Sequence, residues 1–282
     1  MQILDGKALA QQIETEIKFE VGVLSQKGIT PGLAVILVGN DPASQSYVNM
    51  KAKACKRTGI YSITHEMPEN IAQDSLLQTI TMLNANPNID GILVQLPLPK
   101  HIDTTAVLEA IAPHKDVDGF HPFNMGRIFA NLAGFVPATP MGVLSLLKHY
   151  KIEIQGKNVV IVGASNIVGK PLGALFLNEN ATITLCHIYT QDLIAHTKNA
   201  DILCVAVGKP NLITKEMVKQ GAIVVDIGIS KLPSGQIVGD VDFENVAPLC
   251  EFITPVPGGV GPMTIASLLQ NTLKSAKLRA NH

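Results

Sequence analysis

Four polar residues in the first part of the chain have types and positions suited to proton transfer. Tyr47 and Lys51 stand four residues apart in an expected helix over 42–58, so both side chains project from one helix face. Burial that lowers the pKa of a lysine toward neutrality allows it to carry a proton. On an open amphipathic helix, the same lysine would only be a solvated surface charge. We therefore treat Tyr47 and Lys51 as candidates that depend on their surroundings.

Two further residues support a site in the same part of the chain. Gln95 ends a buried run in DGILVQLPLP, where a strand would deliver a neutral amide that can orient a lysine. Asp118 lies in the loop segment KDVDGF, and its carboxylate suits a heterocyclic amine or amidine. Each residue alone could be a turn or capping residue. With Tyr47 and Lys51, however, they stand on helices and strand ends that can converge.

A second signal lies in NVVIVGASNIVGKP, which reads as a strand, a glycine turn and a helix. Gly163 would allow the tight turn, and Gly169 would allow the helix to pack closely on the strand. The amides from Ser165 to Val168 would then face a pyrophosphate. The spacing is G-x-S-x-x-x-G rather than G-x-G-x-x-G, so an ordinary strand–turn–helix packed with small residues remains an alternative.

Neighbouring loops strengthen the nucleotide hypothesis. The segments 207–210 and 226–229 both follow expected strands, so they fall at the same carboxyl edge, where open α/β sheets bind ligands. No acidic residue ends the second strand of this unit, where one would hold the ribose diol of NAD. That position reads Cys186-His187-Ile188-Tyr189.

Short β-branched runs alternate with helical segments along the whole chain, which predicts an α/β fold with parallel sheets. The expected strands are Leu33–Val38, Gly91–Val94, Asn158–Val162, Thr182–Cys186, Asp201–Ala206 and Ala222–Asp226. Asp41, Pro42 and Gly59 mark the ends of the 42–58 helix, and Thr139 with Pro140 marks another helix start. The expected domains are residues 1–118 and a Rossmann-like nucleotide-binding domain over 119–262. A terminal helix over about 263–282 could pack back on the first domain.

Composition excludes several classes of protein. Of the 282 residues, 46% are hydrophobic and 16% are charged, which argues against disorder. A net charge of −1 without a basic block argues against nucleic-acid or anionic-membrane partners. The four cysteines and eight histidines show no zinc spacing, so we expect no metal. Without a signal-peptide pattern or a membrane-length apolar run, the sequence favours a reducing, cytoplasmic location.

The motifs together resemble the bifunctional methylenetetrahydrofolate dehydrogenase/cyclohydrolase family. Besides the segments above, the resemblance rests on SQSYVNMKAKAC, PATP, GAIVVDIGI, VGDVDF and TPVPGGVGPMT, in family order from about residue 36 to 264. It implies two α/β domains flanking a cleft, usually in a homodimer formed through the nucleotide domains. It also implies oxidation of 5,10-methylenetetrahydrofolate with NADP, followed by hydrolysis of the 5,10-methenyl product to 10-formyltetrahydrofolate, within one-carbon metabolism.

The resemblance also implies a role for each site residue. Lys51 would be the general acid and base, Gln95 would hold and tune it, Tyr47 would stack on the aminobenzoyl ring, and Asp118 would bind the pterin. The folate side would further be lined by Pro257, Gly258 and Gly259. The nucleotide contacts would be Gly163, Ala164, Ser165, Ile188 and Ile229.

Two departures and two alternatives complete the interpretation. Many family members carry Arg in place of Ala164, or Ser or Arg in place of Ile188, to meet the 2′-phosphate of NADP. Ala164 and Ile188 offer neither a charge nor a hydroxyl to that phosphate, but no acidic residue repels it or holds the NAD ribose diol either. NADP therefore stays the expected cofactor, with NAD possible and with Ser165, His187 and Tyr189 as partial substitutes. One alternative is another NAD(P)-dependent dehydrogenase, although in short-chain dehydrogenases the Tyr-x-x-x-Lys motif follows the glycine turn instead of preceding it. The other is a non-catalytic folate-binding protein, which would be expected to lack the lysine.

Overall fold

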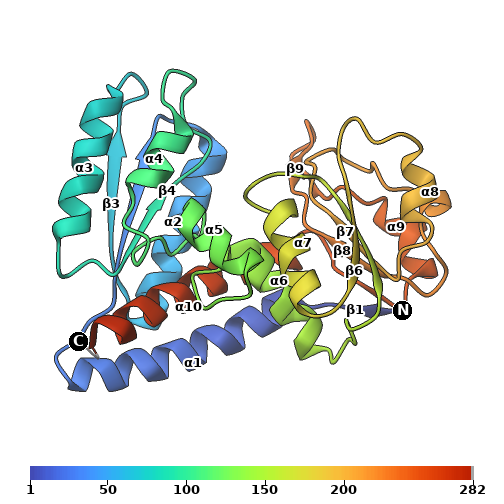
Figure 1. Ribbon diagram of the computed structural model, residues 1–282, viewed down its shortest axis with the longest axis horizontal. Coiled ribbons are helices and arrows are strands. Elements are labelled where there is room, and N and C mark those ends of the chain that lie inside the picture. The colour runs from blue at the N-terminus through green and yellow to red at the C-terminus, as the bar shows by residue number, and fades with distance from the viewer. Residues whose placement is uncertain (281–282) are drawn as a thin grey trace. The chain divides into compact units, whose positions relative to one another are not determined.

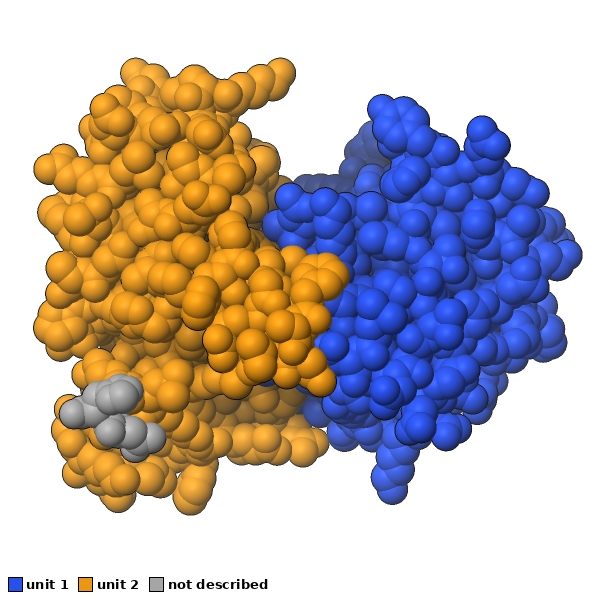
Figure 2. Space-filling view, viewed as in Figure 1, with its two compact units in different colours: residues 1–10, 139–264 blue, residues 11–138, 265–282 orange. Residues whose placement is uncertain are grey.

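The computed structural model describes residues 1–280, and the chain forms two compact units. Unit 1 consists of residues 1–10 and 139–264, and unit 2 consists of residues 11–138 and 265–282 (Figure 2). Each unit contains its own parallel β-sheet, which confirms the predicted α/β class.

Unit 1 is built on a six-stranded parallel sheet in the order β1-β11-β8-β7-β5-β6, as described for residues 1–280. Figure 1 labels its strands β1, β6, β7 and β8. Its strands are β1 Gln2–Ile3, β5 Asn158–Val162, β6 Thr182–Cys186, β7 Ile202–Val205, β8 Ile223–Asp226 and β11 Phe252–Ile253. The helices of this part are α6 Ala138–His149, α7 Gly169–Asn178, α8 Leu193–Thr197 and α9 Phe243–Val246, with 3-10 turns at Lys215–Met217 and Ala247–Leu249. A small hairpin pairs β9 Ser230–Lys231 with β10 Ile237–Val238.

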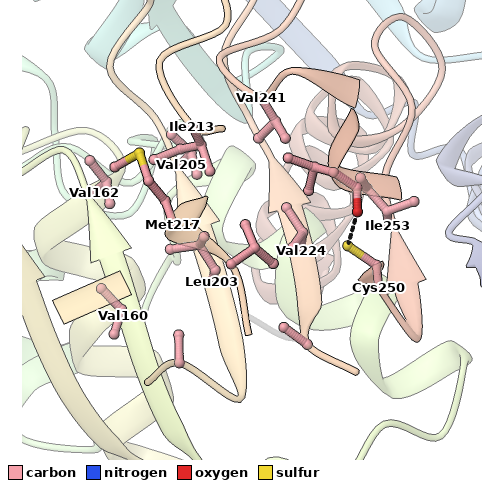
Figure 3. Close-up of a cluster of buried hydrophobic side chains, with 14 of the residues drawn as sticks. Val160, Val162, Leu203, Val205, Ile213, Met217, Val224, Val241, Cys250 and Ile253 are labelled. Carbon is pink, nitrogen blue, oxygen red and sulfur yellow. Dashed lines mark hydrogen bonds between the residues drawn. The ribbon is translucent and has the colours of Figure 1, made fainter. Parts of the chain in front are cut away.

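The core of unit 1 lies along the central strands of this sheet. Val160, Leu203 and Val224 come from three neighbouring strands and are almost wholly buried (Figure 3). Met217 and Val241 cover them from the connecting segments. Because these strands are buried on both faces, their sequences are continuous apolar runs instead of alternating ones.

Unit 2 carries a three-stranded parallel sheet in the order β3-β2-β4. The strands are β2 Gly32–Val38, β3 Tyr61–Met67 and β4 Gly91–Val94. The helices are α2 Pro42–Thr58, α3 Gln73–Ala85, α4 Thr104–Ala110 and α5 Pro122–Phe129. Side chains of α3 and α4 pack with alternate residues of β2 and β4 in one apolar cluster, so these two helices cover one face of the sheet.

Two long helices run at the ends of the chain: α1 Gly6–Gln26 and α10 Val260–Ala280. The part of α10 beyond residue 264 belongs to unit 2. Asn271 donates hydrogen bonds to the carbonyls of Val117 (2.8 Å) and Val136 (2.9 Å), and Ser275 donates to that of His114 (2.9 Å). These bonds fix the terminal helix beside the loop that carries Asp118.

The six predicted strands are all present, each with bounds within one residue of the prediction. Asp41 accepts a hydrogen bond from the Ser44 amide at the start of α2, and Gly59 ends that helix in the left-handed conformation. The predicted start of α6 at Thr139 and Pro140 is slightly wrong, because the helix already begins at Ala138. No helix within residues 1–280 has the length and apolar character needed to cross a membrane.

Candidate active site

Helix α2 carries Tyr47 and Lys51 into a sheltered position of unit 2. Lys51 is only 6% exposed, and Ser44, one helical turn before Tyr47, is buried as well. Burial lowers the pKa of the Lys51 ammonium group, while the negative charge of Asp118 opposes that shift. Burial also raises the pKa of the half-buried Tyr47 hydroxyl. Lys51 therefore has the surroundings that the proton-carrier interpretation requires.

Gln95 meets Lys51 directly. It follows the last residue of β4, and its backbone amide donates to the carbonyl of Ile36 (2.9 Å), which fixes it beside β2. The Gln95 side-chain amide donates to the carbonyl of Leu96 (2.7 Å), and its Oε1 therefore faces Lys51 and accepts from Nζ at 2.9 Å. This neutral acceptor holds the amine in place without stabilising its positive charge as a carboxylate would.

Asp118 lies in a loop that a second carboxylate organises. Oδ1 of Asp116 accepts from the amides of Gly119 and Phe120 (both 3.1 Å), and its Oδ2 accepts from the His121 amide (2.9 Å) and the Asn124 side chain (2.8 Å). Asp116 was missed by the sequence analysis. The sequence pattern that could have identified it is an aspartate three residues before a glycine in KDVDGF, because aspartate side chains often accept the backbone amides of a turn that follows them.

The same loop explains why Asp118 approaches Lys51. The Ile92 amide donates to the carbonyl of Lys115 (2.8 Å), so the loop starts beside β4, the strand that leads into Gln95. Burial raises the pKa of Asp118 to about 6, an effect that the positive charge of Lys51 opposes and the negative charge of Asp116 adds to. Lys51 thus donates a hydrogen bond to Gln95 and interacts through charge with Asp118, and Tyr47 lies on the same helix face as Lys51.

The glycine turn of unit 1 has the close approaches that the sequence predicted. Gly163 has a φ of 116°, and a Cβ on it would overlap the carbonyl oxygen of Ala206. A Cβ on Gly169 would in turn overlap the carbonyl oxygen of Gly163. Both positions therefore require glycine, and they bring the start of α7 against the end of β5.

One detail of the nucleotide prediction is corrected. Helix α7 begins at Gly169, so the segment from Ser165 to Val168 is a turn before the helix rather than its start. The Val168 amide is occupied, because it donates to the Oγ of Ser165 (3.1 Å). That amide is not available to a phosphate unless the Ser165 side chain turns away.

Exposed apolar side chains gather at the carboxyl edge of the unit 1 sheet. Ile188 and Tyr189 are 90% and 85% exposed just after β6, and Val207 and Ile229 are exposed after β7 and β8. Such side chains are suited to the faces of a planar ring, and a glycine turn is suited to a phosphate. The residues present therefore fit a dinucleotide. Ala164 and Ile188 offer no hydroxyl or charge to a 2′-phosphate.

The remaining predicted folate residues lie in unit 1. Gly258 has a φ of 109°, and its carbonyl accepts from the Lys7 amide (2.9 Å). The Gly259 amide donates to the carbonyl of Pro255 (2.9 Å), which closes the turn that contains Pro257. The structure thus brings together Lys51, Gln95 and Asp118 in one unit and places the Pro257–Gly259 turn in the other. Residues 1–280 contain no cluster of three His, Cys, Asp or Glu residues that could hold a metal ion.

Comparisons with known proteins agree over nearly the whole chain. Residues 4–118 match the catalytic domain of the tetrahydrofolate dehydrogenase/cyclohydrolase family, and residues 137–280 match its NAD(P)-binding domain. The bifunctional protein FolD of Wolinella succinogenes is 72% identical over 280 residues, which are 99% of this chain and 98% of that protein.

Solved structures show the same similarity. The bifunctional FolD methylenetetrahydrofolate dehydrogenase/cyclohydrolase of Campylobacter jejuni superposes with a TM-score of 0.98 at 56% identity and covers 99% of both chains. The methylenetetrahydrofolate dehydrogenase-cyclohydrolase of Trypanosoma brucei, solved with NADP and an inhibitor, gives a TM-score of 0.95 at 39% identity. It covers 99% of this chain and 98% of its own.

Proposed function

This chain belongs to the tetrahydrofolate dehydrogenase/cyclohydrolase family, and we propose that Lys51, held by Gln95, is the general acid and base of its cyclohydrolase reaction. The enzyme oxidises 5,10-methylenetetrahydrofolate to the 5,10-methenyl cation and hydrolyses that cation to 10-formyltetrahydrofolate. The observation that carries the proposal is the buried Lys51 Nζ, which donates to a neutral amide oxygen at 2.9 Å.

The two reactions make different demands on the chain. In the oxidation, a folate nitrogen lone pair supplies the electrons as hydride leaves the methylene bridge, so the protein must mainly bring the reactants together in the right orientation. The nicotinamide ring of the bound cofactor supplies the hydride acceptor. We assign the folate chemistry to the predicted domain over 1–118 with the terminal helix, and cofactor binding to the predicted domain over 119–262, of which residues 139–262 lie in unit 1.

The hydrolysis requires protons to move. Water adds to the amidinium carbon and must lose a proton, and the ring nitrogen must gain one as the carbon–nitrogen bond breaks. A lysine whose pKa is lowered by burial can accept the first proton and return it in the second step. We further propose that Tyr47 stacks on the aminobenzoyl ring, that Asp118 binds the pterin, and that Pro257, Gly258 and Gly259 line the folate.

Lys51→Met tests the acid–base role, because it keeps a side chain of similar length but removes the amine. Cyclohydrolase activity should fall by at least ~10²-fold. Lys53→Met is the matched control, since Lys53 is an exposed lysine on the same helix and should leave the rate unchanged. A near-native rate for purified, folded Lys51→Met would overturn the assignment.

We also propose NADP as the cofactor, bound through Gly163, Ala164, Ser165, Ile188 and Ile229. NADP is the cofactor found with the Trypanosoma brucei relative. Because Ala164 and Ile188 lack a partner for the 2′-phosphate, and because no acid holds the NAD ribose diol, discrimination between the two cofactors should be modest. Measuring kcat/KM for both decides this. A preference for NADP above ~10³-fold, or ~4 kcal/mol, would reveal a phosphate-binding group elsewhere.

We propose, finally, a homodimer in a reducing cytoplasm. The dimer is what the family resemblance implies, and light scattering of the purified chain tests it, with a monomeric mass as the contrary result. The location is supported by the four cysteines, which are all free and buried.

A further inference from the structure

Two buried carboxyl groups lie together at the carboxyl edge of the unit 1 sheet. Asp226 is the last residue of β8 and is 3% exposed, and Asp240 follows β10 and is 0% exposed. Neither residue has a part in the folate chemistry assigned to Lys51 and its neighbours. A buried carboxyl group is costly unless it is well hydrogen-bonded, so the partners of this pair indicate what it does.

Asp226 accepts three backbone amides from two different segments. Its Oδ1 accepts from Gly228 (3.1 Å) and from Asp240 (3.0 Å), and its Oδ2 accepts from Val241 (2.9 Å). One carboxyl group therefore joins the loop that follows β8 to the segment that returns from the β9–β10 hairpin.

Asp240 continues the connection to a third segment. Its Oδ2 accepts from the amides of Val207 (2.7 Å) and Gly208 (3.0 Å), in the loop that follows β7. Its Oδ1 is buried and has no hydrogen-bond partner within the described residues. The two carboxyl groups thus connect the loops after β7 and β8 through one returning strand end.

Two glycines let the backbone pass directly over these carboxyl groups. A Cβ on Gly228 would overlap the carboxyl group of Asp240, and a Cβ on Gly239 would overlap that of Asp226. The contacts are reciprocal: Gly228, two residues after Asp226, lies against Asp240, and Gly239, one residue before Asp240, lies against Asp226. Such close packing leaves little freedom in the position of either loop.

The connected loops carry two of the exposed apolar residues at the proposed cofactor site. Val207 donates its own amide to Asp240, and Ile229 directly follows Gly228. We propose that Asp226 and Asp240 are positioning residues for cofactor binding, which fix the loops that bear Val207 and Ile229. This inference rests on the proposed cofactor site of unit 1. Burial, with the charge of Asp240 as a smaller cause, raises the pKa of Asp226 to about 7, in keeping with two acids packed in one dry site.

The bifunctional enzyme supplies its own internal control for this proposal. The cyclohydrolase reaction uses Lys51 in unit 2, so a defect confined to the cofactor loops should leave it unchanged. Asp240→Ala removes both hydrogen bonds to the loop after β7. We expect an approximately 10- to 100-fold higher KM for NADP in the dehydrogenase reaction, with a cyclohydrolase rate within about twofold of wild type.

Asp240→Asn is the conservative variant, because its amide oxygen can still accept from Val207 and Gly208. It should restore KM to within about threefold of wild type. Glu244→Ala, an exposed acid nearby, is the matched control and should change neither reaction. An unchanged KM in Asp240→Ala, or equal effects of the Ala and Asn variants, would overturn the positioning role. A parallel loss of both activities would overturn it too, since it would show a general structural role.

If Asp240→Ala does not fold, Asp226→Asn decides the question. That change places an amide nitrogen against the Val241 amide, so KM for NADP should rise while the cyclohydrolase activity remains. An unchanged KM would again overturn the role. Direct titration with NADPH distinguishes a failure of the positioning role from a failure of the proposed cofactor site. A wild type that does not bind NADPH refutes the cofactor site itself. Binding by the wild type, with equal binding by both variants, refutes only the positioning role.

Discussion

Lowering the pH below the pKa of Asp118 should weaken folate binding at pH values where the chain is still folded. In the free enzyme that pKa is about 6, raised chiefly by burial. We have proposed that the Asp118 carboxylate accepts the amino and ring N–H groups of the pterin. The protonated acid has lost the charge that makes those hydrogen bonds strong, so affinity should follow the ionised fraction.

The magnitude follows from the pKa. At pH 7 about nine-tenths of Asp118 is ionised, and at pH 5 about one-tenth is, so kcat/KM for the folate substrate should fall about five- to tenfold over that range. Hydrogen bonds to a charged group contribute about 1.5–3 kcal/mol, so the fully protonated enzyme should bind about 10- to 150-fold more weakly.

The stability of the chain changes in the opposite direction. Because folding raises the pKa of Asp118, its contribution to stability is fully present below the unfolded value of 3.8 and is lost as the pH rises through about 6. The raised pKa corresponds to at most about 3 kcal/mol. Loss of activity near pH 5 therefore cannot come from Asp118 unfolding the chain, and Asp118→Asn should be more stable than wild type at pH 7.

The assay is kcat/KM for both reactions between pH 5 and 8, with folding monitored by circular dichroism. Asp118→Asn should show a low kcat/KM without the decline that titration of Asp118 causes, so the ratio of the two profiles isolates Asp118 from Lys51 and from groups that titrate in the substrate. A wild-type profile that is flat over this range, or the same decline in the Asn variant, would refute the reasoning.

Three substitutions test the backbone and packing arguments. Gly169→Ala should abolish NADP binding in titration calorimetry, because its methyl group would overlap the Gly163 carbonyl; native-like affinity would contradict the close approach. Gly22→Ala lies in the interior of α1 with no atom within 4 Å of the added methyl, so it should instead raise the free energy of unfolding by ~0.5–1 kcal/mol. A lower free energy of unfolding in urea would contradict this prediction. Arg279→Ala should cost about 1.5–3 kcal/mol in the same assay, since it removes the Nε hydrogen bond (2.7 Å) to the buried Asp90 carboxylate; an unchanged unfolding midpoint would show that this pair contributes nothing.

The sequence predicted strands from short runs of β-branched residues, both in buried strands and in the mostly half-exposed edge strand β6. Gly91–Val94, Asn158–Val162 and Thr182–Cys186 were predicted with the bounds that they have in the structure. Strand β3 was missed, because Ser62, His65 and Glu66 interrupt its apolar and β-branched residues. The two-residue strand β1 was missed because only its pairing with β11, about 250 residues away, defines it.

Site residues could be predicted where the side-chain type and an expected helix face or strand end together indicated a role. Lys51 and Gln95 could be paired from a helix face and a strand end, and the structure places them in hydrogen-bond contact. Asp116 could not be found this way, because it accepts hydrogen bonds from the backbone amides of a loop whose conformation the sequence does not predict. Asp226 and Asp240 were missed for the same reason.

These acids show how one residue type serves two purposes in the same fold. Asp116 and Asp118 differ by two positions, yet the first is occupied by four N–H donors that fix the loop, while the second carries the carboxylate that we assign to the ligand. Unit 1 repeats that division, because Asp226 and Asp240 are occupied by backbone amides and leave the proposed cofactor contacts to exposed apolar side chains. A carboxylate oxygen that already accepts two N–H donors has little capacity left for a ligand, so the hydrogen bonds of each acid help to separate positioning from binding where the sequence cannot.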